Sequence, residues 1–233
     1  MNLENCIKRE HFEHLPSTQE YAKEKRREGA SLLVTAERQS GGKGTKGRSF
    51  SSQVGGVYLS KLTFYSGFSA KNAFLIMASA AVAVCETLCF YGLSPVIKWA
   101  NDVYVQDKKI CGILVENSLS GNQISSSVVG IGLNVCNSLP AELAEIATTM
   151  QEATGKEFSV SEVRERLIAE LGKERSMDEY LSFIGYMGRS ATLIFGDERI
   201  PATLLSVDNE GGLTVEINGE KKRLTAAEVS LRL

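Results

Sequence analysis

The sequence predicts an α+β domain with a mixed, largely antiparallel sheet, followed by a small β-barrel. Up to residue 186, apolar runs of strand length alternate with longer segments of helical character. From residue 187 onward, short alternating runs are separated by the hairpin turn signals GDE, DNEGG and NGE. We therefore expect two domains, formed by residues 1–186 and 187–233.

The first part of the chain predicts two helices and two strands. In the helix PSTQEYAKEKRREG, Ser17 and Glu20 form an S-x-x-E capping box and Gly29 is a natural stop. The apolar run 31–36 predicts a strand, and 56–64 alternates as a second strand does. A long helix is expected over residues 69–91.

The middle of the chain predicts three strands and then a helical region. Residues 95–99 and 108–116 are expected as strands, with YVQDKK between them as a turn, and residues 124–135 as a long apolar strand. Pro140 then begins a helical region. We expect its helices at about 140–153, 160–173 and 176–186.

Composition excludes several classes of partner. With 233 residues and 43% hydrophobic content, the chain can form one good core with a small appended module. A formal net charge of −2 provides no general attraction to nucleic acid or anionic lipid. The most apolar stretch, 73–93, is interrupted by Ser79 and Glu86, which favours a buried helix over a membrane span. We expect neither DNA nor a membrane as partner.

The cysteines indicate a reducing compartment. There are five, an odd number, and they form no C-x-x-C pair. No signal peptide precedes them, so we expect reduced thiols and a cytoplasmic protein.

A stretch rich in cations surrounds a glycine loop. Between Arg38 and Cys85 there are six cations and no acidic residue. Within it, QSGGKGTKGRSF (39–50) has glycines that expose backbone N–H groups and cations that attract an anion. We expect a small anionic ligand here; the alternatives are a solvated charged face and a plain surface loop.

Three familiar phosphate loops do not fit this segment. A Rossmann fingerprint or a P-loop must open a helix, whereas here RSFSSQVGGVYLS predicts a turn and a strand. A protein-kinase glycine loop would need H-R-D and D-F-G, which the chain does not contain. An anion-binding loop between two strands remains.

Four blocks, taken together, resemble the biotin protein ligases. ERQSGGKGTKGRSF, VIKWANDVYVQDKKICGILVE and VVGIGLNVCN match the patterns Q-x-x-G-[RK]-G-R-x-G-R-x-W, K-W-P-N-D…K-x-x-G-I-L-x-E and G-I-G-x-N. Ser17-Thr18-Gln19 corresponds to an S-T-N motif near the start. The resemblance covers about residues 10–137 and implies the class II synthetase-like biotin/lipoate ligase fold, with an SH3-like C-terminal barrel.

The resemblance also implies a two-step reaction. Biotin and ATP form biotinyl-5′-AMP with release of pyrophosphate. Biotin is then transferred to a lysine of the biotin carboxyl carrier protein of acetyl-CoA carboxylase. The family implies Mg²⁺ held by the phosphates, with no certain protein ligands, and a monomer or a ligand-promoted homodimer.

Lys98 is the foremost catalytic candidate. It is a lone charge in the apolar run VIKW, where an unpaired buried ammonium would be costly, so it either reaches water or meets an anion. By resemblance, Lys98, Arg48 and Asp102 are catalytic. The implied biotin-binding residues are Ser17, Thr18, Gln19, Gln39, Gly42, Lys43, Gly44, Thr45 and Lys98. The implied ATP and adenylate residues are Lys43, Lys46, Arg48, Phe50, Asn101 and Asn134.

The chain departs from the family pattern by three substitutions and in SSQVGGVY, which lacks the usual S-P and is one residue shorter. Thr45 stands where the loop normally has its first arginine after G-[RK]-G, so one cation over the phosphate is missing. Phe50 replaces tryptophan, and Ala100 replaces proline in K-W-P-N-D. These departures bear on adenylate retention more than on the reaction class.

Three rival functions remain. The first is a lipoate or octanoate ligase or transferase; a transferase needs a nucleophilic thiol, and Cys111 and Cys136 lie in apolar strands where a structural thiol is favoured. The second is an inactive biotin-binding paralogue. The third, a biotin-sensing repressor, needs about 60 N-terminal residues for a helix-turn-helix, and a helix that starts at Ser17 is expected to leave no room for one.

Overall fold

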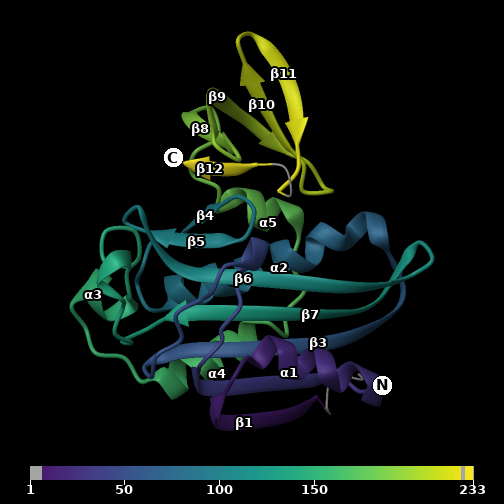
Figure 1. The fold of residues 1–233 in the computed structure, drawn as a ribbon, viewed down its shortest axis with the longest axis vertical. Helices are drawn as coiled ribbons and strands as arrows, with labels where there is room; N and C mark the ends of the chain where they lie inside the picture. The colour runs from purple at the N-terminus through teal and green to yellow at the C-terminus, as the bar shows by residue number, and fades with distance from the viewer. Residues whose placement is uncertain (1–6, 227–228, 233) are drawn as a thin grey trace.

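Two β-sheets, one above the other in Figure 1, form the frame of the structure, a computed structural model that describes residues 7–226 and 229–232. The larger sheet has seven strands in the order β1-β2-β3-β7-β6-β5-β4. Its strands are β1 (Lys8–Leu15), β2 (Leu32–Gln39), β3 (Gly56–Ser69), β4 (Val96–Lys98), β5 (Asp102–Val105), β6 (Lys108–Ser120) and β7 (Gln123–Asn134).

Strand directions in this sheet confirm the predicted fold class. β1 and β2 pair in parallel, and the other strand pairs described in the sheet are antiparallel. The long strands β3, β7 and β6 lie side by side at its centre, where Gly132 of β7 is opposite both Tyr58 and Gly112. The predicted α+β domain with a mixed, largely antiparallel sheet is therefore correct.

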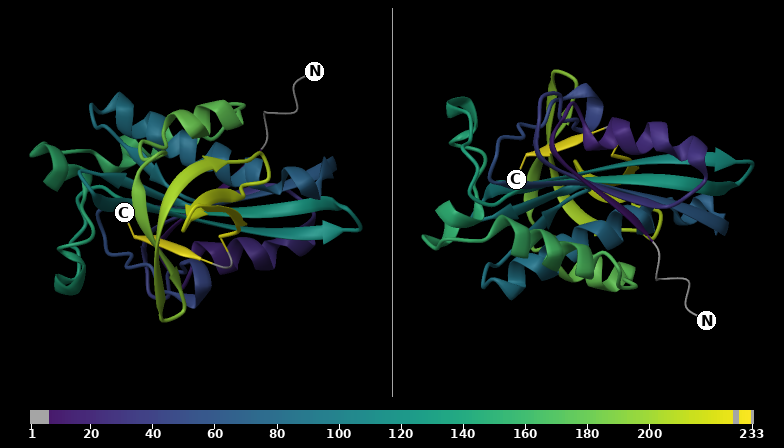
Figure 2. Two further views of the ribbon diagram at one scale, coloured as in Figure 1. Left: turned by 90° about the horizontal axis from the view of Figure 1, so that it is seen from above. Right: turned by 90° about the horizontal axis from the view of Figure 1, so that it is seen from below.

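The two faces of the large sheet are covered by different helices (Figure 2). Helix α1 (Thr18–Lys25) packs on β2, β3 and β7 over a small apolar cluster. Helices α2 (Ala73–Phe90), α4 (Val160–Glu170) and α5 (Met177–Ser182) cover the opposite face. Residues 70–90 are long and apolar enough to cross a membrane, but 56% of the most apolar window is buried, since α2 packs against α4, α5 and the sheet.

Three elements differ from the sequence-based expectation. Strand β1 was not expected, because its charged, half-exposed sequence KREHFEHL lacks the apolar alternation of an inner strand. Strand β5 was not expected; its last two residues, Tyr104 and Val105, begin the expected turn YVQDKK, whose turn residues are 106 and 107. The helix expected over 140–153 is wrong: a short 3₁₀ turn at Ala141–Leu143 is separated from α3 (Met150–Thr154).

The interruption of the expected helix has a local cause. Lys109 of β6 donates its backbone N–H to Ile146 O, and its backbone carbonyl accepts from Thr148 N, at 2.9 Å each, so this segment is bound to the beginning of β6. Thr149 then begins α3 with a capping box to Glu152. The backbone bonds to β6 thus replace helical bonds.

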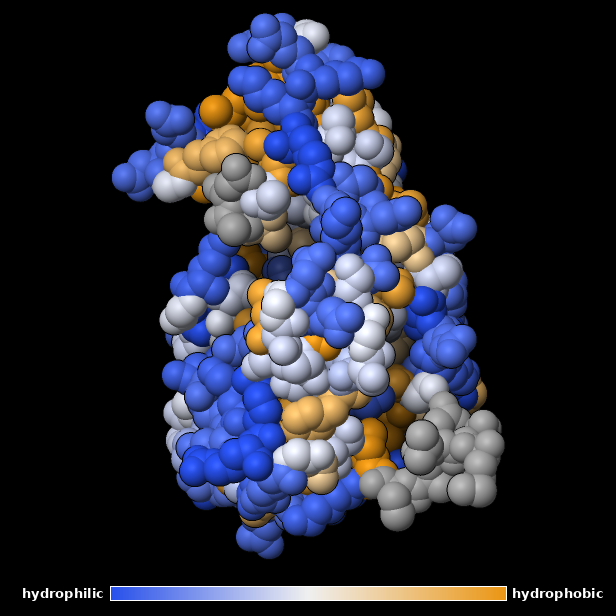
Figure 3. Space-filling model, turned by 90° about the vertical axis from the view of Figure 1, so that its right-hand side faces the viewer, coloured by the Kyte–Doolittle hydropathy of each residue, from blue (hydrophilic) through white to orange (hydrophobic). Residues whose placement is uncertain are grey.

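The smaller sheet is antiparallel, in the order β11-β10-β9-β8-β12. Its strands are β8 (Ser190–Phe195), β9 (Glu198–Val207), β10 (Leu213–Ile217), β11 (Glu220–Leu224) and β12 (Ser230–Arg232). The five strands agree with the predicted small β-domain, although the boundary at residues 186 and 187 stays a prediction. Its tip is hydrophilic in Figure 3, where residues 218–223 of the β10–β11 hairpin are exposed.

Helix α1 is attached to the large sheet through Glu116 of β6. The carboxylate accepts hydrogen bonds from Gln19 Nε2 at 2.8 Å and from Lys23 Nζ at 2.9 Å. Burial alone would raise the pKa of Glu116, but the hydrogen bonds from Gln19 and Lys23 outweigh it and hold the pKa below its usual value. The ionised carboxylate therefore stabilises the folded state.

This attachment predicts a pH-dependent effect of Glu116→Gln. Because the folded pKa is lowered, the stabilisation is complete above the ordinary carboxylate pKa of 4.5 and is lost as pH falls through the folded value. We expect Glu116→Gln to lower the free energy of unfolding at neutral pH, with the difference from wild type shrinking on acidification. Urea denaturation at a series of pH values measures it, with the exposed Glu13→Gln as control; a difference that is constant with pH would contradict the assignment.

Candidate active site

A cavity of about 620 Å³ lies on the α1 side of the large sheet, below the smaller sheet. Its walls come from the N-terminus of α1, the glycine loop 39–51, the β4–β5 turn and the glycine-rich centres of β6 and β7. The remaining described parts of the wall come from β3, from the segment before α3 and from the C-terminal segment, through Leu59, Ser60, Leu139, Leu143, Ile146, Ala147, Ala226, Val229 and Leu231. Segments distant in sequence thus meet at one hollow.

The cavity wall has an excess of positive charge. Five described lining residues are cations, and a single one is acidic, Asp102. The cations are Lys43, Lys46, Arg48, Lys98 and Lys109. Such an excess, in a chain whose net charge is −2, attracts an anionic ligand to this place.

The predicted site residues come together at this cavity, with one exception. Gly42 does not line it: a Cβ there would lie 2.4 Å from Phe50 O and 2.6 Å from Ser52 Oγ, so Gly42 packs inside the loop. The residues that do line it are Ser17, Thr18, Gln19, Gln39, Lys43, Gly44, Thr45, Lys46, Arg48, Phe50, Lys98, Asn101, Asp102 and Asn134. Their individual roles stay predictions.

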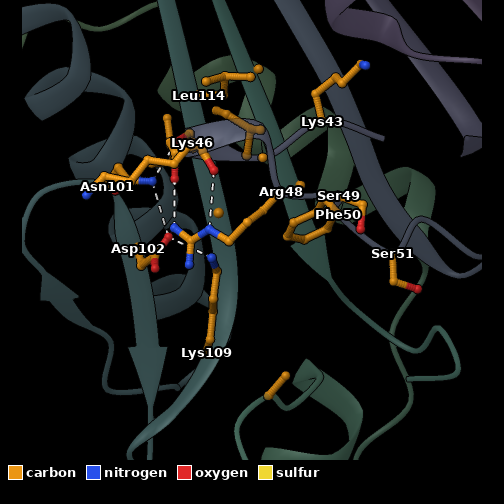
Figure 4. A pocket seen from close by; sticks show the side chains of 18 of the residues that line it. Lys43, Lys46, Arg48, Ser49, Phe50, Ser51, Asn101, Asp102, Lys109 and Leu114 are labelled. Atoms are coloured by element: carbon orange, nitrogen blue, oxygen red, sulfur yellow. Dashed lines mark hydrogen bonds and ion pairs between the residues drawn. The ribbon is translucent and has the colours of Figure 1, made fainter. Parts of the chain in front are cut away.

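The glycine loop is folded by its own hydrogen bonds. Gly44 N donates to Arg48 O at 2.7 Å, and Phe50 N donates to Gly42 O at 2.9 Å. The Arg48 side chain folds back on Thr45: Nε donates to the Thr45 carbonyl at 3.2 Å and Nη2 to Thr45 Oγ1 at 3.0 Å. Figure 4 shows that this places the guanidinium close to Asp102 and Lys109.

The side chains of the two lysines in the loop point in directions that differ from that of Arg48. Lys46 Nζ donates to Val229 O at 3.3 Å, which connects the loop to the C-terminal segment. Lys43 extends away from the Arg48–Asp102 group in Figure 4. The three cations of the loop therefore point in different directions.

Lys98 and Asp102 lie opposite each other at the ends of β4 and β5. Lys98 Nζ donates to Tyr104 Oη at 3.2 Å and lies 4.8 Å from the centre of its ring. Burial raises the pKa of Tyr104 to about 12, so the phenol that accepts from Lys98 is neutral at physiological pH. Asp102 Oδ1 is 2.7 Å from Lys109 Nζ and also accepts from Asn101 Nδ2 at 3.3 Å.

The inner end of the cavity is a buried network of hydroxyl and amide groups. Gln39 Oε1 accepts from Thr18 N at 2.8 Å and from Thr18 Oγ1 at 3.1 Å, and Gln39 Nε2 donates to Ser52 Oγ at 2.8 Å. Ser60 Oγ donates to Thr18 Oγ1 at 2.9 Å. Gln19 joins the network through its Oε1, which accepts from Ser60 Oγ at 3.3 Å, while its Nε2 donates to Glu116. The network fixes Thr18, Gln39 and Ser60 as oriented partners for a polar, uncharged group.

Phe50 lies on the glycines at the centre of the sheet. A Cβ at Gly132 would be 2.5 Å from Phe50 Cε1, and one at Gly112 would be 3.2 Å from Cε2, so side chains at these positions would displace the ring. Beside it, the buried amide of Asn134 donates to Thr148 O at 3.2 Å and accepts from Asn137 Nδ2 at 3.2 Å. Asn134 thereby holds the segment before α3 against the cavity.

Sequence reasoning did not identify several lining residues. Lys109 is the K of the K-x-x-G-I-L-x-E pattern, so a signal for it was present. Tyr104 had no such signal, because its segment was interpreted as a turn. The apolar wall of Leu139, Leu143 and Ile146 was hidden by the incorrect helix over 140–153.

Metal-binding groups are scarce in the part of the chain that the structure describes. There, no group of three or more His, Cys, Asp or Glu side chains is close enough together to hold a metal ion. At the cavity, Asp102 is the single described carboxylate, and it is paired with Lys109.

Comparison with known proteins places the chain in a family. Residues 11–134 match the model of the biotin/lipoate A/B protein ligase family. The chain is 31% identical over 236 residues to the bifunctional ligase/repressor BirA of Bacillus subtilis, covering 93% of this chain and 72% of that protein. It is 27% identical to the biotin–[acetyl-CoA-carboxylase] ligase of Paracoccus denitrificans, over 85% of this chain and 90% of that one.

A solved structure supports the same placement. The biotin protein ligase from Aquifex aeolicus, in complex with biotin and ATP, superposes with a TM-score of 0.76 and 32% sequence identity, covering 97% of this chain and 98% of that chain. The predicted resemblance and the predicted ligase class are confirmed. The family model matches more than half of the chain, and the match to BirA of Bacillus subtilis covers nearly all of it. The chain therefore belongs to the biotin/lipoate A/B protein ligase family.

Proposed function

We propose that this chain is an ATP-dependent biotin protein ligase. It activates biotin as biotinyl-5′-AMP and transfers the acyl group to a lysine of a biotin carboxyl carrier protein. The observation that carries the proposal is the shape and charge of one cavity. A buried, neutral hydrogen-bonding end suits the ureido ring of biotin, and five cations against one carboxylate suit a carboxylate meeting a triphosphate.

The neutral end and the cationic end of the cavity predict how biotin and ATP bind. Thr18, Gln39 and Ser60 offer oriented donors and acceptors to the ureido group, and the carboxylate of biotin then extends toward Lys98. The adenine of ATP packs near Phe50 and the apolar wall that includes Leu143. Both reactants are thereby held in one orientation, which lowers the entropic part of the barrier.

In the first step, a carboxylate oxygen of biotin attacks the α-phosphorus of ATP. The bond from that phosphorus to the bridging oxygen of the β-phosphate breaks, and pyrophosphate leaves. Negative charge builds up between the carboxylate and the α-phosphate. Lys98 and Arg48 stabilise this charge, and their hydrogen bonds to the neutral groups of Tyr104 and Thr45 keep the two cations oriented.

In the second step, the amine of the carrier lysine attacks the carbonyl carbon of the mixed anhydride. A C–N bond forms, the bond to the phosphate oxygen breaks, and AMP leaves. Asp102 is the acidic side chain described at the cavity, and Asn101 and Lys109 fix its orientation. It orders the incoming amine by charge and hydrogen bonding.

Mg²⁺ fits this site as an ion held mainly by phosphate oxygens. Mg²⁺ is commonly bound by one or two carboxylates together with substrate phosphates and water, and Asp102 is the carboxylate available here. When bound, the ion neutralises charge on the departing pyrophosphate.

A lipoate or octanoate reaction is the second candidate. As a transferase it would need a reactive thiol, but Cys111 is fully buried and burial raises the pKa of its thiol far above the usual value. Cys136 is exposed, donates toward Gly55 O at 3.5 Å and does not line the cavity. An ATP-dependent ligase for lipoate or octanoate therefore remains the rival.

The deciding experiment measures pyrophosphate release and carrier acylation together. The chain is mixed with ATP and either biotin, lipoate or octanoate, and a carrier domain is then analysed by mass spectrometry. Biotin-dependent pyrophosphate release and a biotinyl mass shift support the proposal. Turnover with lipoate or octanoate alone identifies the rival, and binding of biotin without pyrophosphate release identifies an inactive paralogue.

Lys98→Ala should abolish adenylate formation and leave the fold intact. Removing a fixed charge from the place where the carboxylate and the α-phosphate meet is expected to slow pyrophosphate release by about 100-fold or more. Lys71→Ala is the matched control, because Lys71 belongs to the same acid-free stretch but does not line the cavity. Near-normal release by Lys98→Ala would contradict its role.

Thr45→Arg should retain the adenylate for longer. A guanidinium over its phosphate adds a charge-assisted hydrogen bond of about 1.5–3 kcal/mol, whereas threonine offers one neutral donor. Dissociation of biotinyl-5′-AMP should slow by about tenfold or more, which corresponds to about 1.4 kcal/mol. The measurement is a chase of labelled adenylate with excess unlabelled ligand.

Thr45→Ser is the control for that comparison, because it retains the hydroxyl that accepts from Arg48 Nη2. It should release adenylate as fast as wild type. Equal off-rates for wild type and Thr45→Arg would show that Arg48 and the other cations already retain the adenylate.

A further inference from the structure

The turn that joins β4 to β5 carries Lys98 at its start and Asp102 at its end. Between them lie Trp99, Ala100 and Asn101. Since three residues separate the two predicted catalytic side chains, any shift of this turn moves both of them. What holds the turn therefore decides the geometry of the site.

Asn101 ties the end of the turn to β6. Its backbone carbonyl accepts from Ile113 N at 3.0 Å, and its side chain Nδ2 donates to Ile113 O at 2.9 Å. This part of the turn is fixed from within the large sheet.

The rest of the turn is fixed by residues that follow it far along the chain. Ala100 O accepts from Tyr180 Oη at 3.0 Å, and the backbone N–H of Trp99 donates to Tyr186 Oη. Tyr180 is fully buried in α5, and Tyr186 lies between α5 and β8. The two phenols thus satisfy two backbone groups that the turn itself leaves unpaired.

The indole of Trp99 extends this connection to the smaller sheet. Trp99 is 5% exposed, and its Nε1 donates to Gly211 O at 3.0 Å. A buried indole N–H needs such an acceptor. The acceptor belongs to the loop between β9 and β10, so the turn that bears Lys98 and Asp102 is hydrogen-bonded directly to the C-terminal sheet.

The β9–β10 loop is built to present that carbonyl in one place. Asp208 accepts from Glu210 N at 2.9 Å and from Gly212 N at 2.8 Å, and it pairs with Arg223. Gly211 has a φ of +82°, and a Cβ there would be 2.1 Å from the ring of Phe74. The loop is therefore rigid and fits closely against the N-terminus of α2.

We propose that Tyr186 and the Asp208–Gly212 loop are positioning elements of the active site, acting through Trp99 on the turn that bears Lys98 and Asp102. The inference rests on the proposed ligase function and adds a route by which the C-terminal sheet affects the chemistry. Tyr186, Asp208 and Gly211 do not line the cavity, so their effect on the reaction is indirect.

The proposal predicts an effect on turnover rather than on substrate affinity. Tyr186→Phe retains the ring but removes the hydroxyl that accepts from Trp99 N, and Trp99→Phe removes the indole donor to Gly211 O. We expect each to lower kcat for pyrophosphate release by about 10- to 100-fold, because small misplacements of reacting groups have effects of this size. KM for biotin should stay within about threefold, since the inner end of the cavity is untouched.

Tyr65→Phe is the matched control. It also removes one phenol hydroxyl that is hydrogen-bonded inside the fold, to Ser127 Oγ at 2.9 Å, but the partly buried Tyr65 lies toward the far end of β3 and outside the cavity wall. Its kcat should equal that of wild type. A general effect of losing a buried hydroxyl would appear in Tyr65→Phe as well.

A spectroscopic readout tests the contact itself, because Trp99 is the one tryptophan of the chain. Acrylamide quenching of its fluorescence should increase in Asp208→Asn and in Tyr186→Phe, as the β9–β10 loop or the turn loosens. Asp208→Asn alters neither Trp99 nor the cavity wall and serves if Trp99→Phe folds poorly. We expect its kcat to fall together with the rise in quenching.

The outcomes separate this inference from the proposed function. If wild type releases no pyrophosphate with biotin and ATP, the proposed function fails. If wild type is active, and Tyr186→Phe and Asp208→Asn show increased quenching with unchanged kcat, the positioning role is overturned. Unchanged quenching in folded Asp208→Asn would equally overturn it, since the loop would then not control the indole.

Discussion

Mutual repulsion of like charges is the constraint on which the cavity depends. Five cations lie around one hollow with a single carboxylate among the described lining residues, so that carboxylate cannot orient all of them and other groups must contribute. Lys98 is held by a neutral phenol, Arg48 by the carbonyl and hydroxyl of Thr45, and Lys46 by the carbonyl of Val229. A neutral acceptor orients a cation without cancelling its charge, which is how a site is organised in advance for developing negative charge.

The ion pair between Lys109 and Asp102 is the exception, because here a cation of the cavity wall is bound to a carboxylate. A lone carboxylate among cations would attract the nearest of them, and Arg48 lies close by in Figure 4. Lys109 provides that partner from β6, and Asn101 donates a further hydrogen bond. The carboxylate therefore keeps its orientation, and Arg48 keeps its contacts with Thr45. The position of Asp102 therefore depends on its own strand β5, on Lys109 of β6 and on Asn101 of the β4–β5 turn.

Much of this arrangement could be predicted from the sequence, because the motif residues lie at strand ends and in loops that long apolar strands bring together. The glycine loop and Lys98 were singled out by their own residues, and Asn134 by the family resemblance. Sequence could not predict β1, whose charged residues suit an edge strand, nor the break in the expected helix over 140–153, where backbone bonds to Lys109 compete with helical bonds. Tyr180, Tyr186 and Gly211 were also missed, since contacts across the fold leave no local pattern.

The three substitutions in the family pattern are each accommodated by a neighbouring contact. Thr45 is short enough for Arg48 to fold back on it, so the loop retains one well-oriented guanidinium. Phe50 packs its ring on Gly132 and Gly112, where any larger residue would collide with it. Ala100 has its carbonyl bound by Tyr180. Each substitution is therefore linked to a partner elsewhere in the chain, and the geometry of the cavity is a property of the whole fold more than of its motifs.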